Sequence, residues 1–264
     1  MPVTIFDHLP ATTQEALTAQ AGVVTGFRSA SHGNHAHVAG ELRTENGSVF
    51  IKAAPVDDRE SLYVRHEVGV HDHVGRFGPP LLWNLEAGGW YVAAWMFLDL
   101  RHPVYKPGSP DLAVVAGLIL NLGTTPCPDE IDWTVESRYE GAIGASVSVL
   151  GGSTILHTDL NPSNVLINED ETAFAVDWAF CSRGAAWLEC AYLMPWLIQG
   201  GHTSGEAEAW LKETFPAWRD APEGHVDIFV RTLAQVWARR DVPEAPQWVR
   251  EYAAAAQDWH QHRS

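Results

Sequence analysis

Positive charge is scarce in this sequence. Only 17 lysine and arginine residues stand against 33 aspartate and glutamate residues, which gives 264 residues a formal net charge of −16. A chain this acidic repels phosphate backbones, so we do not expect nucleic acid as a partner. The acid excess is larger in residues 101–264, with 22 acids against 11 bases, than in residues 1–100, with 11 against 6. It indicates either a solvated surface or an electrostatic attraction for a cationic small molecule.

Cysteine and long apolar runs are also few. Cys127, Cys181 and Cys190 are an odd number without the short spacing of metal ligands, which argues against a disulfide framework and a zinc cluster. The longest apolar stretches, 90–98 and 113–120, are about half a membrane span. The first ten residues lack the basic and then apolar pattern of a signal peptide. We therefore expect a cytoplasmic protein with no membrane partner.

Signatures of two hydrolase classes are missing. The sequence has no Gly-x-Ser-x-Gly, so a serine hydrolase lacks its nucleophile turn. His66 and His71 lie five residues apart, whereas a zinc metalloprotease needs two histidines four apart on a helix. We interpret His32, His35 and His37 as a polar strand and loop rather than a metal cluster.

The first hundred residues predict an antiparallel sheet with one helix. Asn46-Gly47 is a strong hairpin signal between two apolar segments. A stretch of mixed polar and apolar residues begins at Asp57 and Asp58 and ends near Gly75. It predicts an amphipathic helix, with Leu62, Val64, Val68, Val70 and Val74 along it. The expected strands are residues 23–30, 36–44, 48–54, 80–85 and 90–95.

The second part of the chain predicts mainly helices, with one short hairpin. The hairpin pairs residues 165–167 with residues 174–176 around a polar tip at 168–171. Eight of the twelve tryptophans lie from Trp178 onward; most are expected in the core, and a few are candidates to line a pocket for a flat or cationic ligand. The expected helices are residues 111–122, 134–150, 187–197, 206–215, 226–239 and 246–260.

The most informative segment is His157-Thr158-Asp159-Leu160-Asn161-Pro162-Ser163-Asn164, followed by the hairpin and Asp177. Phosphoryl transfer from ATP needs a carboxylate beside the acceptor hydroxyl, oxygen ligands for Mg²⁺ and a cation on the phosphates. Asp159, Asn164 and Asp177 offer the first two, because carboxylate and amide oxygens are the hard ligands that Mg²⁺ prefers.

This pattern, H-x-D-x-x-x-x-N followed by a hairpin and an Asp, resembles the protein-kinase-like superfamily, and within it the aminoglycoside phosphotransferase and choline kinase branch. Trp178 after Asp177 is common in that branch. The resemblance implies that Asp159 positions or deprotonates the acceptor hydroxyl, that Asn164 and Asp177 hold Mg²⁺, and that His157 braces the loop. It also implies an α+β, two-lobed fold: an N-terminal nucleotide-binding lobe at 1–94 with an antiparallel sheet and one helix, a hinge at 95–99, and a larger helical lobe at 100–264 that binds the acceptor, with the active site between the lobes.

Lys52 lies on the third expected strand, where kinases keep the lysine that reaches the α- and β-phosphates of ATP. It is the first lysine of the chain and follows three apolar residues, which favours this role over that of a surface lysine. Glu67 on the following helix is the preferred ion-pair partner, and Glu60 is the alternative. Glu189 begins a later helix, where we favour a structural brace over an acceptor contact.

Two further segments complete the expected nucleotide site. Ser31, His32, Gly33 and Asn34 occupy the turn of the phosphate loop, although only one glycine is present; their backbone N–H groups are expected over the phosphates. The resemblance implies that Met96, Phe97 and Leu98 offer backbone groups to adenine.

The sequence therefore predicts an ATP- and Mg²⁺-dependent O-phosphotransferase whose acceptor is a hydroxyl on a small cationic molecule, such as an aminoglycoside or an amino alcohol. Two alternatives stay open. The acceptor can instead be a Ser or Thr of a natural-product peptide. The chain can also be a catalytically silent pseudokinase that binds nucleotide or a partner protein.

Overall fold

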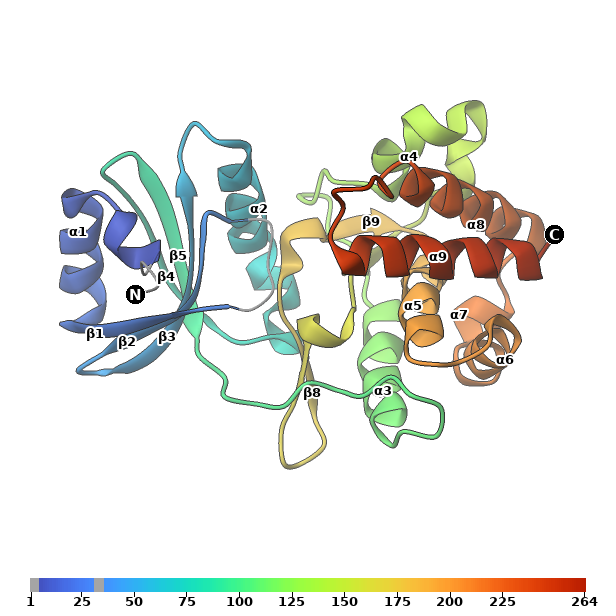
Figure 1. Ribbon diagram of the computed structural model, residues 1–264, viewed down its shortest axis with the longest axis horizontal. Coiled ribbons are helices and arrows are strands. Elements are labelled where there is room, and N and C mark those ends of the chain that lie inside the picture. The colour runs from blue at the N-terminus through green and yellow to red at the C-terminus, as the bar shows by residue number, and fades with distance from the viewer. Residues whose placement is uncertain (1–4, 31–35) are drawn as a thin grey trace. The chain divides into compact units, whose positions relative to one another are not determined.

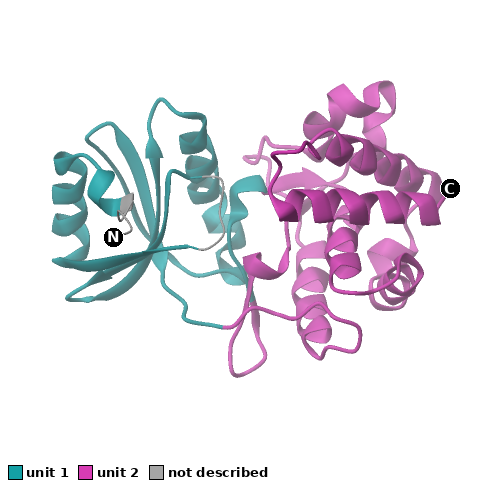
Figure 2. Ribbon diagram, in the orientation of Figure 1, with its two compact units in different colours: residues 1–100, 174–180 teal, residues 101–173, 181–264 magenta. Residues whose placement is uncertain are grey.

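The computed structural model describes residues 5–30 and 36–264 and divides the chain into two compact units. Unit 1 comprises residues 1–100 and 174–180, and unit 2 comprises residues 101–173 and 181–264 (Figure 2). The segment 174–180 thus groups with the N-terminal sheet, although the sequence boundary assigns it to the helical lobe. The limits of the lobes and the hinge at 95–99 stay predictions.

A five-stranded antiparallel sheet in the order β1-β2-β3-β5-β4 forms the centre of unit 1. All five strands expected from the sequence are confirmed. Gly47, with φ of 120°, closes the turn between β2 and β3, a conformation that favours glycine. The strands are β1 (Val24–Ser29), β2 (Val38–Thr44), β3 (Gly47–Pro55), β4 (Leu81–Ala87) and β5 (Trp90–Met96).

Helices α1 (Ala11–Ala21) and α2 (Arg59–Val74) lie on opposite faces of this sheet (Figure 1). Leu17 of α1 packs in a core with alternate residues of the strands, and Val64 of α2 packs in a second core that contains Trp95. The sequence indicated α2 but not α1, because α1 buries only Thr13 and Leu17 and has little apolar periodicity. Leu62, placed among the apolar positions of α2, is 58% exposed.

Unit 2 is mainly helical, and every helix expected there is present. The expected helix at 134–150 is shorter, because Gly144 adopts a φ of 67° and the chain continues as the 3-10 helix η3 (Gly144–Leu150). The helices are α3 (Asp111–Gly123), α4 (Val135–Ile143), α5 (Trp187–Gln199), α6 (Ser204–Thr214), α7 (Pro216–Arg219), α8 (Glu223–Ala238) and α9 (Gln247–His262).

Two small sheets frame the central motif of the chain. Strand β6 (Thr154–Leu156) pairs antiparallel with β9 (Ser182–Gly184), and the expected hairpin is formed by β7 (Val165–Ile167) and β8 (Ala173–Ala175). The loop that begins at His157 therefore leaves directly from a short, paired strand. Helix α5, which follows β9, buries ten of its thirteen residues.

Two expectations from composition can be compared with the structure. Cys127, Cys181 and Cys190 all lie among the described residues as buried thiols outside any disulfide. Among the residues that the structure describes, no helix combines the length and the apolar character needed to cross a membrane.

Candidate active site

Lys52 lies on the face of β3 that is turned toward α2. Side chains alternate along a strand, so Ile51 and Ala53 enter the core shared with α1, while Lys52 emerges on the opposite face. Its ammonium group donates to Glu67 Oε2 at 2.6 Å and to Asp177 Oδ1 at 2.7 Å. The structure thus brings together three residues predicted from separate parts of the sequence.

The environment of this ion-pair cluster fixes its charges. Burial opposes the charge of Lys52, which is 8% exposed, but Asp177 and Glu67 outweigh that effect and raise the pKa of Lys52. Burial raises the pKa of Glu67, while the charge of Lys52 acts in the opposite direction. Lys52 is therefore held as a cation whose position is set by two carboxylates.

The segment that carries Asp177 is docked on α2. The backbone N–H of Trp178 donates to Glu67 Oε1 at 3.1 Å, so Glu67 bonds both Lys52 and the residue after Asp177. Gly78 allows this approach, because a Cβ atom there would lie 2.6 Å from the carbonyl oxygen of Ala175. Asp177 itself has φ of 65°, a left-handed conformation that aspartate tolerates better than most residues. Packing, rather than local preference, fixes this carboxylate.

In unit 2, the loop after β6 presents Asp159. Asn164 donates through Nδ2 to the backbone oxygen of Asp159 at 3.0 Å and to its Oδ2 at 3.1 Å, and Asn161 Nδ2 donates to Asp159 Oδ1 at 3.2 Å. Asn161 Oδ1 also accepts from the N–H groups of Ser163 and Asn164, which begins the single turn at 162–164. Both oxygens of Asp159 are thereby held by amide donors.

Glu189 of α5 holds the start of this loop through hydrogen bonds to its backbone. Its carboxylate, 1% exposed, accepts from the backbone N–H of His157 at 2.6 Å and of Thr158 at 3.0 Å. This is the bracing position expected for Glu189. Burial raises its pKa to about 7, against the two backbone hydrogen bonds, which lower it.

Three residues of this loop environment were not identified from the sequence. Tyr105 donates from its hydroxyl to the carbonyl oxygen of Leu160 at 3.0 Å, and Arg138 donates to Thr158 Oγ1 at 2.9 Å. Tyr252 is buried, and its pKa is raised by burial and further by Tyr139 and Asp159. These contacts join residues 20 or more positions apart, so no local pattern identifies them.

No family model matches the chain, and no curated protein matches its sequence. Solved structures do resemble it. The choline kinase LicA from Streptococcus pneumoniae has a TM-score of 0.65 at 12% identity, over 94% of this chain and 98% of that one. An aminoglycoside phosphotransferase from Alicyclobacillus acidocaldarius has a TM-score of 0.63 at 13% identity, over 97% and 95%. The chain has a two-lobed protein-kinase-like fold.

A spectinomycin phosphotransferase, solved as its AMP-bound complex, shares this kinase-like fold at a TM-score of 0.60 and 9% identity, over 95% of this chain and 98% of that one. At such identities the similarity establishes the fold. The expected fold class is thereby confirmed. The expected structural resemblance to aminoglycoside phosphotransferases and choline kinases is confirmed as well.

The remaining predicted site residues are placed as follows. Ser31, His32, Gly33 and Asn34 lie outside the described residues. Met96 ends β5, is 45% exposed and donates its backbone N–H to the carbonyl oxygen of Pro80. Phe97 and Leu98 follow as half-buried residues outside regular structure, and their contact with adenine stays a prediction.

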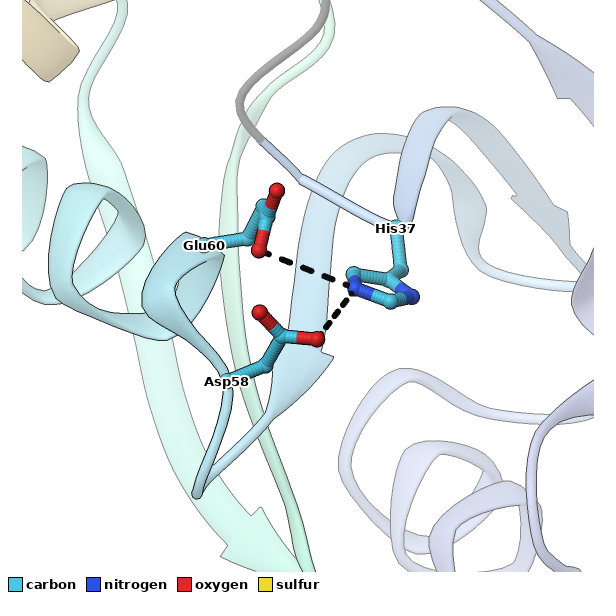
Figure 3. A group of neighbouring side chains, drawn as sticks. All are labelled: His37, Asp58 and Glu60. Carbon is cyan, nitrogen blue, oxygen red and sulfur yellow. Dashed lines mark hydrogen bonds and ion pairs between the residues drawn. The ribbon is translucent and has the colours of Figure 1, made fainter.

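Two of the histidines set aside as metal ligands, His37 and His71, have other partners, and His32 and His35 lie outside the described residues. His37 Nε2 lies 2.9 Å from Asp58 Oδ2 and 3.8 Å from Glu60 Oε2 (Figure 3). All three side chains are more than a third exposed, at 42%, 38% and 34%, so this is a surface contact of the kind that adds little to stability. His71 Nε2 accepts from the backbone N–H of Leu81, and burial lowers its pKa.

Aromatic side chains gather in unit 2 on α5, α8 and α9. The ring of Tyr252 lies 4.3 Å from that of Trp237 and 4.9 Å from that of Trp196, and Trp248 lies 5.9 Å from Trp237. We call Trp196, Trp237, Trp248 and Tyr252 the aromatic cluster. Trp248 is 40% exposed, and Trp196 and Trp237 are half-buried, so part of this cluster meets solvent.

Many acids of the helical half have structural partners. Glu208 and Asp227 accept from the guanidinium of Arg263, each at 2.8 Å, and Glu206 closes a capping box at the start of α6. Asp258 accepts from Ser204 Oγ. These acids stabilise helix ends and helix contacts, which favours the solvated and structural interpretation of this part of the acid excess.

Proposed function

We propose that this protein is an ATP- and Mg²⁺-dependent O-phosphotransferase that acts on a hydroxyl of a small cationic molecule. The observation that carries the proposal is the pair of intact clusters on a kinase-like fold. Lys52, Glu67 and Asp177 form one, and Asp159 and Asn164 form the other. Together they contain the cation, the metal ligands and the acceptor carboxylate that phosphoryl transfer requires.

Asp159 is the group that receives the acceptor. Its two oxygens accept amide hydrogen bonds from Asn161 and Asn164, which orient the carboxylate without neutralising it. A hydroxyl that donates to this carboxylate is aligned for attack, and its proton passes to Asp159 as the phosphoryl group is transferred. Lys52, held by two carboxylates, supplies positive charge to the phosphate oxygens of ATP.

Asn164 and Asp177 carry the oxygen atoms that Mg²⁺ would need. Asn164 donates through Nδ2 to Asp159, so its Oδ1 is the atom offered to a cation. Asp177 offers carboxylate oxygens, of which Oδ1 accepts from Lys52. Both residues therefore fit a hard, oxygen-coordinated cation. When bound, Mg²⁺ neutralises charge on the phosphate oxygens.

The aromatic cluster supports a cationic acceptor. Arg240 already lies over the ring of Trp237, with its Cζ 4.6 Å from the centroid, so an indole face of this cluster attracts a cation. The pKa of Tyr252, in the same cluster, is raised by burial and further by Tyr139 and by the charge of Asp159. An acceptor whose ammonium group binds these rings would bring one of its hydroxyl groups toward the carboxylate of Asp159.

The test is ATP consumption with a library of hydroxyl compounds that includes aminoglycosides, amino alcohols and a Ser/Thr peptide. Wild-type protein is compared with Asp159→Asn and with Asp170→Asn, a matched change of an exposed acid at the hairpin tip. We expect turnover with an amine-bearing acceptor, a loss of at least about 10²-fold in kcat for Asp159→Asn, and wild-type kcat for Asp170→Asn.

Two results would contradict the proposal in different ways. Turnover with the peptide alone would replace the small cationic acceptor by a Ser or Thr. Nucleotide binding without turnover of any acceptor would instead support a pseudokinase.

A further inference from the structure

Thr158, immediately before Asp159, has a backbone conformation that its side chain disfavours. Its φ is 66°, in the left-handed region, and it is 5% exposed. Among the described residues, two other non-glycine positions share a positive φ: Glu171 at the hairpin tip and Asp177. Threonine is branched at Cβ, and for branched residues this region is a genuine outlier. Surrounding contacts must therefore hold Thr158 in place.

Thr158 is held by contacts that include one to its backbone and one to its side chain. Glu189 accepts from its backbone N–H at 3.0 Å, and Arg138 Nη1 donates to its Oγ1 at 2.9 Å. The same guanidinium donates through Nη2 to Ser182 Oγ of β9 at 2.8 Å. The planar fork of arginine suits two such acceptors at once, and an ammonium group does not reproduce it. Arg138 thus links α4, β9 and the loop that carries Asp159.

We propose that Arg138 is a positioning residue, which clamps Thr158 in the left-handed conformation and thereby sets the direction of Asp159. If Thr158 moved to an ordinary negative φ, the chain beyond its Cα would turn, and the carboxylate of Asp159 would leave its amide partners. The kinetic part of this inference rests on the proposed function.

The test uses two substitutions of Thr158 whose order separates a clamp from simple packing. Thr158→Val keeps the branched shape but removes the hydroxyl that Arg138 binds, so the strained conformation loses its clamp. Thr158→Gly also removes the hydroxyl, but glycine adopts positive φ without a steric penalty. If Thr158 mattered only for packing, valine would be the milder change, because glycine leaves space in a buried position.

We expect Thr158→Gly to keep kcat within about threefold of wild type, whereas Thr158→Val and Arg138→Met lose about tenfold or more, since small misplacements of a reacting group have effects of this size. The KM for ATP should stay within about twofold in all three variants. In the Thr158→Gly background, Arg138→Met should lower kcat by no more than about threefold, because the clamp is no longer needed. A kcat for Thr158→Val equal to or above that of Thr158→Gly would overturn the proposal.

Ser182→Ala is the control for the second contact of Arg138. It removes a hydrogen bond to the same guanidinium but leaves Thr158 bonded, so kcat should stay within about twofold of wild type. A loss in Ser182→Ala as large as that in Thr158→Val would show that Arg138 acts through β9 instead, and would overturn the assignment.

Thermal unfolding tests the clamp without any acceptor. The midpoint of Thr158→Gly should exceed that of Thr158→Val by about 3 °C or more, given the usual relation between strain and midpoint for a chain of this size. If wild-type protein turns over no acceptor but this order of midpoints holds, the proposed function fails and the clamp stands. If the order is reversed, the clamp fails whatever the activity.

Discussion

Replacing Lys52 by methionine would remove the cation that two buried carboxylates share. Methionine is similar in length to the apolar stem of lysine, so the change removes the charge, which lies 5.8 Å from the centroid of the Trp95 ring, and keeps most of the side-chain volume. The change leaves Glu67 and Asp177, which bond Lys52 at 2.6 and 2.7 Å, without their common donor. Removing one partner of a buried ion pair destabilises a protein by about 3–5 kcal/mol. At about 2–4 °C per kcal/mol, the thermal midpoint should fall by about 6–20 °C.

The loss should depend on pH, and its sign follows from Glu67. Burial already raises the pKa of Glu67, and loss of Lys52 removes an interaction that lowers it. The folded state of the variant then binds a proton more tightly than the unfolded state does, so its stability increases as the pH falls toward the unfolded pKa of Glu67 and decreases as the pH rises through the folded one. The difference from wild type should therefore be largest at pH 8 and smaller at pH 5.

The assay is thermal unfolding followed by circular dichroism at both pH values, with and without ATP and Mg²⁺. Lys106→Met, which changes an exposed lysine, is the matched control and should leave the midpoint within about 1 °C. ATP should raise the midpoint of wild type and control but not of Lys52→Met. A Lys52→Met midpoint within about 2 °C of wild type at pH 8, or a deficit that grows toward pH 5, would refute the reasoning.

Three other predictions concern the metal, a buried acid and the acceptor. Asp177→Ala should abolish the dependence of ATP affinity on Mg²⁺ in titration calorimetry, and equal wild-type affinity with Mg²⁺ and with EDTA would contradict the metal assignment. Burial raises the pKa of Glu189 to about 7, so the contribution of Glu189 to the free energy of unfolding is present below its unfolded pKa and decreases as the pH rises through 7. Glu189→Gln should flatten that decrease in denaturant titrations. An unchanged pH profile would contradict the raised pKa of Glu189. The KM of a cationic acceptor should rise between about 20 mM and about 300 mM NaCl while kcat stays level, because salt screens its attraction to the acidic lobe; a constant KM would favour a neutral or peptide acceptor.

Much of the fold could be predicted from local sequence, because each strand or helix depends mainly on neighbouring residues. Alternating apolar side chains and the Asn46-Gly47 turn were enough for β2 and β3, and the change to helical spacing was enough for α3 and α5. Helix α1 was missed, since it packs on the sheet through Leu17 with little apolar periodicity. Packing against a surface formed elsewhere in the chain, rather than its own pattern, stabilises it.

The candidate site divides in the same way. The sequence by itself was enough to name the candidate residues of the loop from His157 to Asn164, because their spacing is a local property of the chain. Only the tertiary structure decided between Glu67 and Glu60 for Lys52. Glu67 is buried on the side of α2 that contacts β3 and bonds Lys52 at 2.6 Å, while Glu60 lies at the start of α2 near His37. It alone revealed Arg138 and grouped Asp177 with the sheet. These contacts join residues far apart in the sequence, so they depend on how helices and strands pack and leave no periodic signal along the chain.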